Sequence, residues 1–279
     1  METIMNNNEM IYYPQDEMTT ALLPVTYGCS YNKCAFCSMY KDDKYSEVSF
    51  FDIEIQLLNI NKYTERVFLI GADPTSIGFD KMKELLDLIH QYLPYCACVS
   101  CYSSIRNLSK YSIEELSFLH DAGLRLLYIG FETGSNEVLE LMNKPHTLNQ
   151  AINQANKLNK AKLQFNTIII YGIAGKDRSI DNATATAKMI NQFNTKRIIT
   201  MNLKIFEGTR LYNMVKEGDY VPSDGNDRLL ELKTLLENLE PAQSTIFDTT
   251  HPTNIIKIKG TLPQDRKRLI NKIKKYLNH

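Results

Sequence analysis

The sequence C-S-Y-N-K-C-A-F-C runs from Cys29 to Cys37 and places three thiols within nine residues. It follows an apolar stretch that ends in Thr26-Tyr27-Gly28. Thiolates prefer zinc, copper(I) or iron–sulfur clusters to hard cations. Structural zinc sites and most iron–sulfur clusters take four protein ligands, so three thiols predict a metal centre with one coordination position open for chemistry.

A structural zinc loop is the alternative interpretation of these thiols. Its fourth ligand would come from Cys96, Cys98, Cys101 or a histidine. Structural zinc sites usually show paired C-x-x-C motifs, which favours the open centre. The five histidines contain no H-E-x-x-H motif and no closely spaced pair, so they add no metal pattern of their own.

Six apolar, β-rich runs, each followed by a helical pattern, predict the fold class. The runs are Leu22–Tyr27, Val67–Ile70, Cys96–Cys101, Leu126–Phe131, Phe165–Tyr171 and Ile198–Phe206. This alternation predicts an α/β protein in which parallel strands are wrapped by helices, and six units would form a partial barrel. Periodicity alone leaves a doubly wound open sheet as an alternative. In barrels the chemistry lies at the carboxyl ends of the strands, where the cysteine loop begins.

Local helix signals support these units. Phe79, Met82, Leu85, Leu86 and Ile89 form one apolar helical stripe. Capping boxes are predicted at Ser112 with Glu115 and at Thr147 with Gln150, and Gly123 is a predicted helix stop.

The cysteine loop resembles the cluster loop of the radical S-adenosylmethionine (SAM) superfamily, including the aromatic Phe36 before the last cysteine. The resemblance implies that Cys29, Cys34 and Cys37 hold a 4Fe–4S cluster and that SAM chelates its fourth iron. It also implies a partial (β/α)6 barrel of the TIM type, covering roughly residues 21–212. One departure is the spacing C-x4-C-x2-C, where the superfamily usually has C-x3-C-x2-C.

Further matches imply residues that contact SAM. Gly71-Ala72-Asp73-Pro74 corresponds to the glycine-rich turn after the second strand, and Gly130-Phe131-Glu132-Thr133-Gly134 resembles the G-x-E-x-G signature of the elongator and methylthiotransferase-like branch. Glu132 would then face SAM. An ordinary turn at Gly71 and a helix-capping role for Glu132 are the alternatives. The resemblance gives similar SAM-binding roles to Arg106, Lys144 and Gly172.

A second cysteine group, Cys96, Cys98 and Cys101, allows two interpretations. Some members of the superfamily bind an auxiliary cluster with additional cysteines. Residues 96 and 98 would share one face of a strand while residue 101 faces the other, which favours packing in the core. Whether the group binds a second cluster stays open at this point.

The length and charge of the chain limit which folds and partners are expected. A chain of 279 residues with 43% apolar content can bury a full core. Basic and acidic residues balance at 32 each, so net charge gives no pull toward nucleic acid or acidic lipid, although nucleic acid stays an open partner. The chain shows no signal peptide and no long apolar span, which predicts a cytoplasmic protein without a membrane partner.

Three regions are expected along the chain: an N-terminal segment at 1–20, the barrel core at 21–225, and a helical and extended segment at 226–279 that covers the barrel. From Lys257 to Lys275 the last region is strongly basic and has a single acid, Asp265. His251, just before it, is the candidate catalytic residue, with a surface or turn role as the alternative.

The resemblance implies an oxygen-sensitive enzyme that cleaves SAM reductively and uses the 5′-deoxyadenosyl radical to abstract hydrogen from its substrate. A small or medium substrate is expected, and the basic tail is compatible with an anionic one. An electron donor such as flavodoxin or ferredoxin would be required. The alternative is a radical-SAM-like cofactor-binding protein or haem chaperone without turnover, although the His-Asn…Tyr-Trp motif of haem chaperones is missing and the chain has no Trp.

Overall fold

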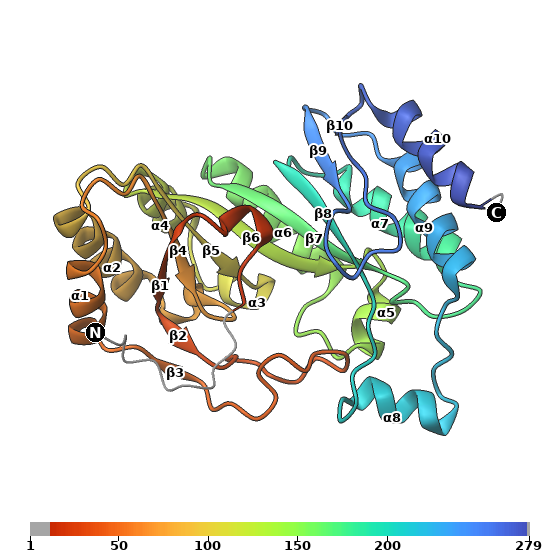
Figure 1. Cartoon of the computed structure of the whole chain (residues 1–279), viewed down its shortest axis with the longest axis horizontal. Coiled ribbons are helices and arrows are strands. Elements are labelled where there is room, and N and C mark those ends of the chain that lie inside the picture. The colour runs from red at the N-terminus through yellow and green to blue at the C-terminus, as the bar shows by residue number, and fades with distance from the viewer. Residues whose placement is uncertain (1–11, 278–279) are drawn as a thin grey trace.

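A single eight-stranded sheet forms the centre of the computed structural model, which describes residues 12–277 (Figure 1). Its order is β1 (Ala21–Pro24), β4 (Arg66–Ile70), β5 (Cys98–Ser103), β6 (Leu124–Glu132), β7 (Gln164–Tyr171), β8 (Arg197–Asn202), β9 (Thr245–Asp248) and β10 (Lys259–Leu262). Neighbours from β1 to β9 pair in parallel, and β10 pairs antiparallel to β9. A separate hairpin joins β2 (Thr26–Tyr27) to β3 (Ser46–Glu47). The predicted α/β partial barrel is therefore confirmed.

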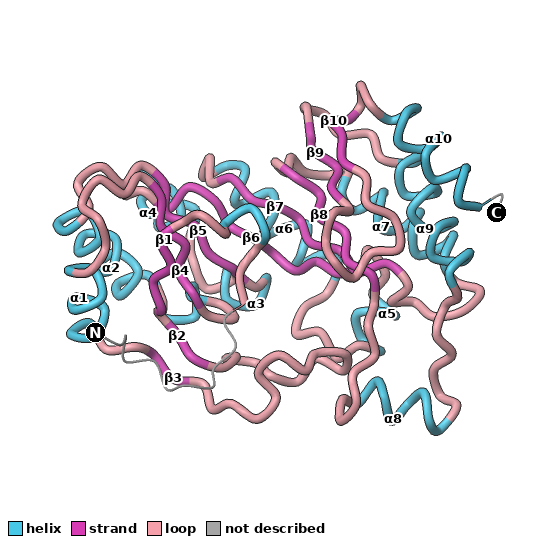
Figure 2. Tube along the Cα trace, viewed as in Figure 1, coloured by secondary structure: helices cyan, strands magenta, loops and turns pink. Residues whose placement is uncertain are grey.

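Most of the helices cover the outer face of the curved sheet, as Figures 1 and 2 show. The helices of the described residues are η1 (Gln15–Glu17), which lies on the inner face, and α1 (Phe50–Leu58), η2 (Pro74–Ile77), α2 (Phe79–Tyr92), α3 (Ile105–Leu108), α4 (Ile113–Asp121), α5 (Asn136–Leu141), α6 (Leu148–Lys160), α7 (Ser179–Ile190), α8 (Arg210–Glu217), α9 (Gly225–Asn238) and α10 (Arg266–Leu277). Both predicted capping boxes are present, at Ser112 with Glu115 and at Thr147 with Gln150. Gly123 follows α4 with a φ of +102°, which confirms the predicted stop.

Alternation along each strand separates two apolar layers. On β4, Val67 and Leu69 face outward and pack in the large core beneath the helices. Phe68 and Ile70 face inward and pack with Tyr128 of β6 in a smaller cluster inside the barrel. Both faces of the sheet are apolar because both are covered, as is usual for parallel sheets.

All six predicted strands differ from the observed ones at one or both limits, and three of the differences have a clear local cause. Cys96 belongs to the turn after α2, where its N–H donates to the Leu93 carbonyl, so β5 begins at Cys98. The chain leaves the sheet after Asn202, before the predicted end at Phe206. The first run divides at Val25, because the chain turns from β1 into the β2–β3 hairpin. Apolar residues in neighbouring turns and loops continue the sequence pattern of a strand, although the backbone there is no longer paired in the sheet.

The N-terminal helix η1 lies across the inner face of the sheet. Glu17 is fully buried there, and its carboxylate accepts bonds from Arg66 Nε at 2.8 Å, Tyr128 Oη at 2.9 Å and Ser100 Oγ at 3.0 Å. Asp16 pairs with Arg197 at 2.9 Å. Arg66 and Arg197 are the first residues of β4 and β8. η1 therefore closes the barrel at the amino ends of its strands.

The C-terminal region contributes to the sheet itself. β9 pairs with β8, β10 pairs with β9, and α10 packs on α9. The connection between β9 and β10 carries His251 to the inner face, while Arg266 bonds the Leu239 carbonyl at the end of α9. The expected regions 1–20, 21–225 and 226–279 stay a prediction. None of the helices within residues 12–277 is long and apolar enough to cross a membrane.

Candidate functional site

The cysteine loop connects β2 to β3 along the lower edge of the view in Figure 1, near α5 and α8. Cys29, Cys34 and Cys37 are free thiols with intermediate exposure. The Cys37 N–H donates to the Cys34 carbonyl at 3.2 Å, and the Asn32 N–H donates to Cys29 Sγ at 3.4 Å. These local bonds fold the loop so that its thiols lie at the carboxyl edge of the barrel.

Segments that follow β6 and β8 hold this loop in place. The Ala35 N–H donates to the Met142 carbonyl at 2.9 Å, and the Ala35 carbonyl accepts the Leu211 N–H at 2.8 Å. Asn143 Nδ2 donates to the Lys33 carbonyl at 2.7 Å. These bonds anchor the cysteine loop, which is the predicted cluster loop, to distant parts of the chain.

Burial affects the protonation of two of the thiols. Burial raises the pKa of Cys34 to about 11 and also raises the pKa of Cys37. Such thiols are neutral at physiological pH unless a bound metal deprotonates them. Among the described residues, no three His, Cys, Asp or Glu side chains are arranged as ligands of one metal ion. The donor set fits a 4Fe–4S cluster, in which each thiolate binds a different iron.

Glu132 and Lys144 form a buried ion pair beside the cluster loop. Lys144 Nζ lies 2.8 Å from Glu132 Oε1 and 6.0 Å from the Phe36 ring centroid. Burial alone would lower the pKa of Lys144, but the Glu132 carboxylate together with Cys34 and Cys37 outweighs burial and raises the pKa. A Cβ at Gly130 would lie 2.4 Å from Glu132 Oε1. The glycine therefore provides the space that the Glu132 carboxylate occupies.

The backbone at Glu132 is strained. Its φ is +64°, and the register between β6 and β7 shifts between Gly130 and Glu132. A left-handed conformation is unfavourable for a residue with a Cβ and is often found at functional sites. The bulge ends β6 with the Glu132 side chain directed toward Lys144.

The turn after β4 contains three of the predicted SAM residues. Gly71 has a φ of +146°, and a Cβ there would lie 2.0 Å from Thr26 Oγ1. Ala72 is partly exposed next to it. The buried Asp73 carboxylate accepts bonds from the Ser104 N–H at 3.1 Å and Asn107 Nδ2 at 2.7 Å. Asp73 therefore ties this turn to the end of β5 through its own side chain.

Arg106 and Gly172 approach the site from other strand ends. Arg106 Nη1 donates to the Ser30 carbonyl at 3.3 Å, and its guanidinium carbon lies 5.6 Å from the Tyr31 ring centroid. The Gly172 N–H donates to Glu231 Oε2 at 2.7 Å, and its carbonyl accepts the Tyr220 hydroxyl at 2.8 Å. Arg106 thus contacts the cluster loop, while both backbone groups of Gly172 are already bonded.

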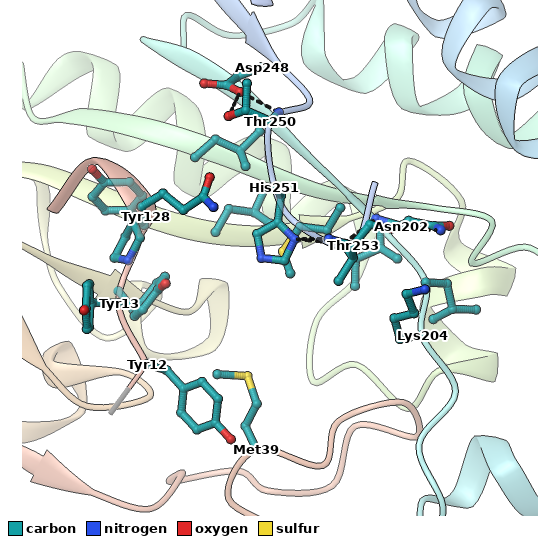
Figure 3. Close-up of a pocket in the computed structure, with 18 of the residues that line it drawn as sticks. Tyr12, Tyr13, Met39, Tyr128, Asn202, Lys204, Asp248, Thr250, His251 and Thr253 are labelled. Atoms are coloured by element: carbon teal, nitrogen blue, oxygen red, sulfur yellow. Dashed lines mark hydrogen bonds between the residues drawn. The ribbon is translucent and has the colours of Figure 1, made fainter. Parts of the chain in front are cut away.

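A cavity of about 860 Å³ lies inside the barrel next to these residues (Figure 3). Phe36 and Cys37 line it on the side of the cluster loop, and Ile168, Ile170 and Ile199 line its middle. Figure 3 shows Tyr12, Tyr13 and Met39 on one side and His251, Thr253 and Lys204 on the other. The cavity therefore extends from a predicted cluster ligand into the barrel.

Of the expected residues, Phe36, Cys37 and His251 line the cavity, whereas Cys29, Cys34, Glu132, Lys144, Arg106, Gly71, Ala72, Asp73 and Gly172 are not among its lining residues. His251 Nδ1 bonds Thr253 Oγ1 at 2.8 Å, and burial lowers its pKa. Asp16 and Arg197 also line the cavity, and neither was expected from the sequence. Arg197 could have been singled out in the sequence, because it is a charged residue directly before an apolar run.

Two of the three cysteines of the second group lie in the core, and Cys98 is partly exposed. Cys96 is 5% exposed, Cys101 is fully buried, and both pack in the main hydrophobic cluster. Cys98 Sγ accepts a bond from Arg66 Nη1 at 3.0 Å. Packing, which the strand pattern favoured, explains Cys96 and Cys101.

The model of the radical SAM superfamily matches residues 23–183, which is more than half of the chain. The chain belongs to the radical SAM superfamily. This confirms the resemblance inferred from the cysteine loop. The match includes the cluster loop and the strand ends that carry Gly71, Arg106, Glu132 and Gly172.

Individual relatives are distant. The haem chaperone of Bacillus subtilis is 21% identical over 201 residues, covering 70% of this chain and 51% of the chaperone. The tRNA uridine(34) acetyltransferase of Methanocaldococcus jannaschii is 26% identical over 110 residues, covering 39% of this chain and 20% of that enzyme. The chain therefore spans about half or less of these relatives. The acetyltransferase match agrees with the predicted elongator-like branch.

The structure of methylornithine synthase has a similar fold. Its TM-score is 0.56 at 14% identity, and the superposition covers 92% of this chain and 81% of the synthase. At this identity the likeness supports the partial barrel only.

Proposed function

We propose that this protein is a radical SAM enzyme that abstracts a hydrogen atom from a small or medium substrate held in the barrel cavity. Cys29, Cys34 and Cys37 would hold the 4Fe–4S cluster. When bound, the cluster would pass one electron to the SAM sulfonium, so that a carbon–sulfur bond breaks to give methionine and a 5′-deoxyadenosyl radical. Flavodoxin or ferredoxin is the class of electron donor that we propose.

One observation supports this proposal most directly. Phe36 and Cys37 belong to the cluster loop and also line the cavity of about 860 Å³. A radical formed beside the cluster would therefore face the cavity inside the barrel. That volume lies within the usual range of small-molecule sites.

The residues around the loop would bind and orient SAM. Lys144 is a buried cation that suits the SAM carboxylate, and Glu132 is a buried anion that suits its amino group or ribose. In the ligand-free pair each satisfies the other. On binding, SAM would replace the Glu132–Lys144 ion pair with one bond to each of these residues. Arg106 and the turn at Gly71 are nearby.

The cavity indicates the general form of the substrate. Its middle is apolar, with Ile168, Ile170 and Ile199 excluding water and offering few alternative polar contacts. Its far end contains Asp16, Arg197, Asp248 and Lys259, in which Lys259 lies 3.4 Å from Asp248. A molecule with an apolar body and a polar or charged end fits this arrangement, and an anionic end would contact Lys259.

The cluster assignment can be tested on protein purified without oxygen. We expect about four irons and four sulfides per chain, and loss of both in a Cys29→Ala, Cys34→Ala, Cys37→Ala variant. A Cys96→Ala, Cys101→Ala variant is the matched control and should keep the iron. Zinc in place of iron, or iron retained by the triple variant, would contradict the assignment.

Turnover is tested by reducing the loaded protein in the presence of SAM. We expect 5′-deoxyadenosine and methionine in equal amounts, with faster production when an anaerobic cell extract supplies the substrate. The match to the haem chaperone favours one alternative, a binding protein without turnover. A fully loaded, reduced protein that forms no 5′-deoxyadenosine and binds haem would support that alternative.

A further inference from the structure

Glu231 on α9 joins two turns that lie far apart in the sequence. Its side chain is almost completely buried, with the residue 3% exposed. Oε2 accepts the Gly172 N–H at 2.7 Å, at the end of β7. Oε1 accepts Asn182 Nδ2 at 2.6 Å, on α7. One carboxylate thus bonds both a turn at the barrel's carboxyl edge and the neighbouring helix.

Asn182 extends this connection to the turn after β6. Its Oδ1 accepts the Thr133 hydroxyl at 2.5 Å, and the Gly134 N–H donates to Thr186 Oγ1 at 3.0 Å. A Cβ at Gly134 would lie 2.3 Å from the Ala185 carbonyl oxygen, so the turn rests directly on the α7 backbone. The bonds form a continuous path from Glu231 through Asn182 to Thr133, the residue after Glu132.

The turn at Glu132 needs such support, and the turn at Gly172 is bonded to the same carboxylate. Glu132 has a φ of +64°, a conformation that persists only where surrounding contacts fix it. Gly172 has a φ of +81° and directs its N–H toward α9. Burial raises the pKa of Glu231 to about 7, and the hydrogen bonds from Asn182 and the Gly172 N–H offset part of the cost of burying its carboxylate. A residue needed only to fill space on α9 would not require a charge.

We propose that Glu231 is a positioning residue for SAM: it fixes the two turns at the carboxyl edge of the barrel that carry Glu132 and Gly172. This inference rests on the proposed function, because it assumes that these two turns bind SAM. Glu231 acts through Gly172 on one branch and through Asn182 and Thr133 on the other. Loss of the carboxylate should therefore loosen both turns, while loss of the Thr133 hydroxyl should loosen one.

The test uses full-length, cluster-loaded protein and two isosteric variants. Glu231→Gln keeps the shape of the side chain but removes one of its two acceptors, and Thr133→Val removes the hydroxyl. Glu237→Gln is the matched control, because Glu237 lies on the same helix and pairs on the surface with Lys233. Two quantities are measured without turnover: backbone hydrogen exchange at residues 130–135 and 171–175, and the dissociation constant of SAM.

For Glu231→Gln we expect unchanged iron content, exchange about tenfold faster in both turns, and SAM binding weaker by about tenfold, because one bond to a charged group is lost. Thr133→Val should accelerate exchange at residues 130–135 alone and also weaken SAM binding. Glu237→Gln should leave both quantities unchanged.

Two results would overturn the inference. One is wild-type exchange and SAM affinity in Glu231→Gln. The other is a uniform rise in exchange across the whole sheet with unchanged SAM affinity, which would identify Glu231 as a residue of general stability. If the wild-type protein bound no SAM, the proposed function would fail instead, and the local exchange pattern would still decide whether Glu231 holds the two turns.

Discussion

Gly130 has no side chain, and this absence of a Cβ makes room for Glu132. An alanine there would place its Cβ 2.4 Å from Glu132 Oε1. The contact involves the end of a flexible side chain, so the fold should adapt while the carboxylate moves away from Lys144. We expect Gly130→Ala to fold normally but to bind SAM about tenfold more weakly, as measured by equilibrium dialysis with loaded protein.

Gly225→Ala is the matched control at this scale. Gly225 is the first residue of α9, and a Cβ there would contact nothing within 4 Å. The control should bind SAM like the wild type. An unchanged SAM affinity in Gly130→Ala would remove Glu132 from the SAM site and leave it with a structural role beside Lys144.

Some site residues could be predicted from sequence and others could not. Cys29, Cys34 and Cys37 are close in the chain, so their spacing alone indicates a metal centre. Glu231 bonds Gly172 across 59 residues, and no local pattern distinguishes it from a surface glutamate on an amphipathic helix. Its role depends on how α9 packs against α7 and β7. The packing of α9 against α7 and β7 cannot be predicted from the spacing of residues along the sequence.

At the scale of elements, η1 is held inside the barrel by charge. Glu17 pairs with Arg66 of β4 while fully buried, and hydrogen bonds from Arg66, Thr20 and Tyr128 outweigh burial and lower the pKa of Glu17. Removing one partner of a buried pair leaves the other uncompensated. We expect Arg66→Ala, which leaves the fully buried Glu17 carboxylate unpaired, to reduce the free energy of unfolding by about 3 kcal/mol in urea denaturation. Glu17→Ala should cost less, because Arg66 is 35% exposed and water can solvate it.

A double-mutant cycle separates this pair from simple loss of packing. The double variant should lose less than the sum of the two single variants, because both remove the same interaction. The control is Glu47→Ala, whose partner Lys81 is half-exposed, and it should cost at most about 1 kcal/mol. Additive losses would show that Glu17 and Arg66 stabilise the protein independently.

The strands themselves were predictable because apolar runs alternate with helical patterns, and this order leads to parallel pairing. The position of η1 was not predictable, because its bonds to Arg66, Tyr128 and Arg197 join residues that are distant in the chain. The same holds for β9 and β10, which are short and polar compared with the six predicted strands. Their pairing depends on β8 offering a free edge.

At the scale of the whole molecule, residues 245–277 are part of the same folded unit as the barrel. β9 covers the edge of β8, and Phe247, Leu269 and Ile273 are fully buried. Each such side chain contributes about 1.5–3 kcal/mol. Together with Ile256 and Ile258 they account for roughly 10 kcal/mol, which is comparable with the total stability of a typical domain.

We therefore expect a chain truncated after Glu240 to be insoluble or largely unfolded, because it would expose both the β8 edge and the apolar face of α9. Single substitutions on α10 give a milder test. Leu269→Ala and Ile273→Ala should each cost about 2–5 kcal/mol in urea denaturation, while Lys272→Ala, exposed on the same helix, should stay within about 0.5 kcal/mol. A soluble truncated chain that melts cooperatively at the wild-type temperature would show instead that the barrel is complete without its last two strands, and that this region serves only to line the cavity through His251 and Lys259.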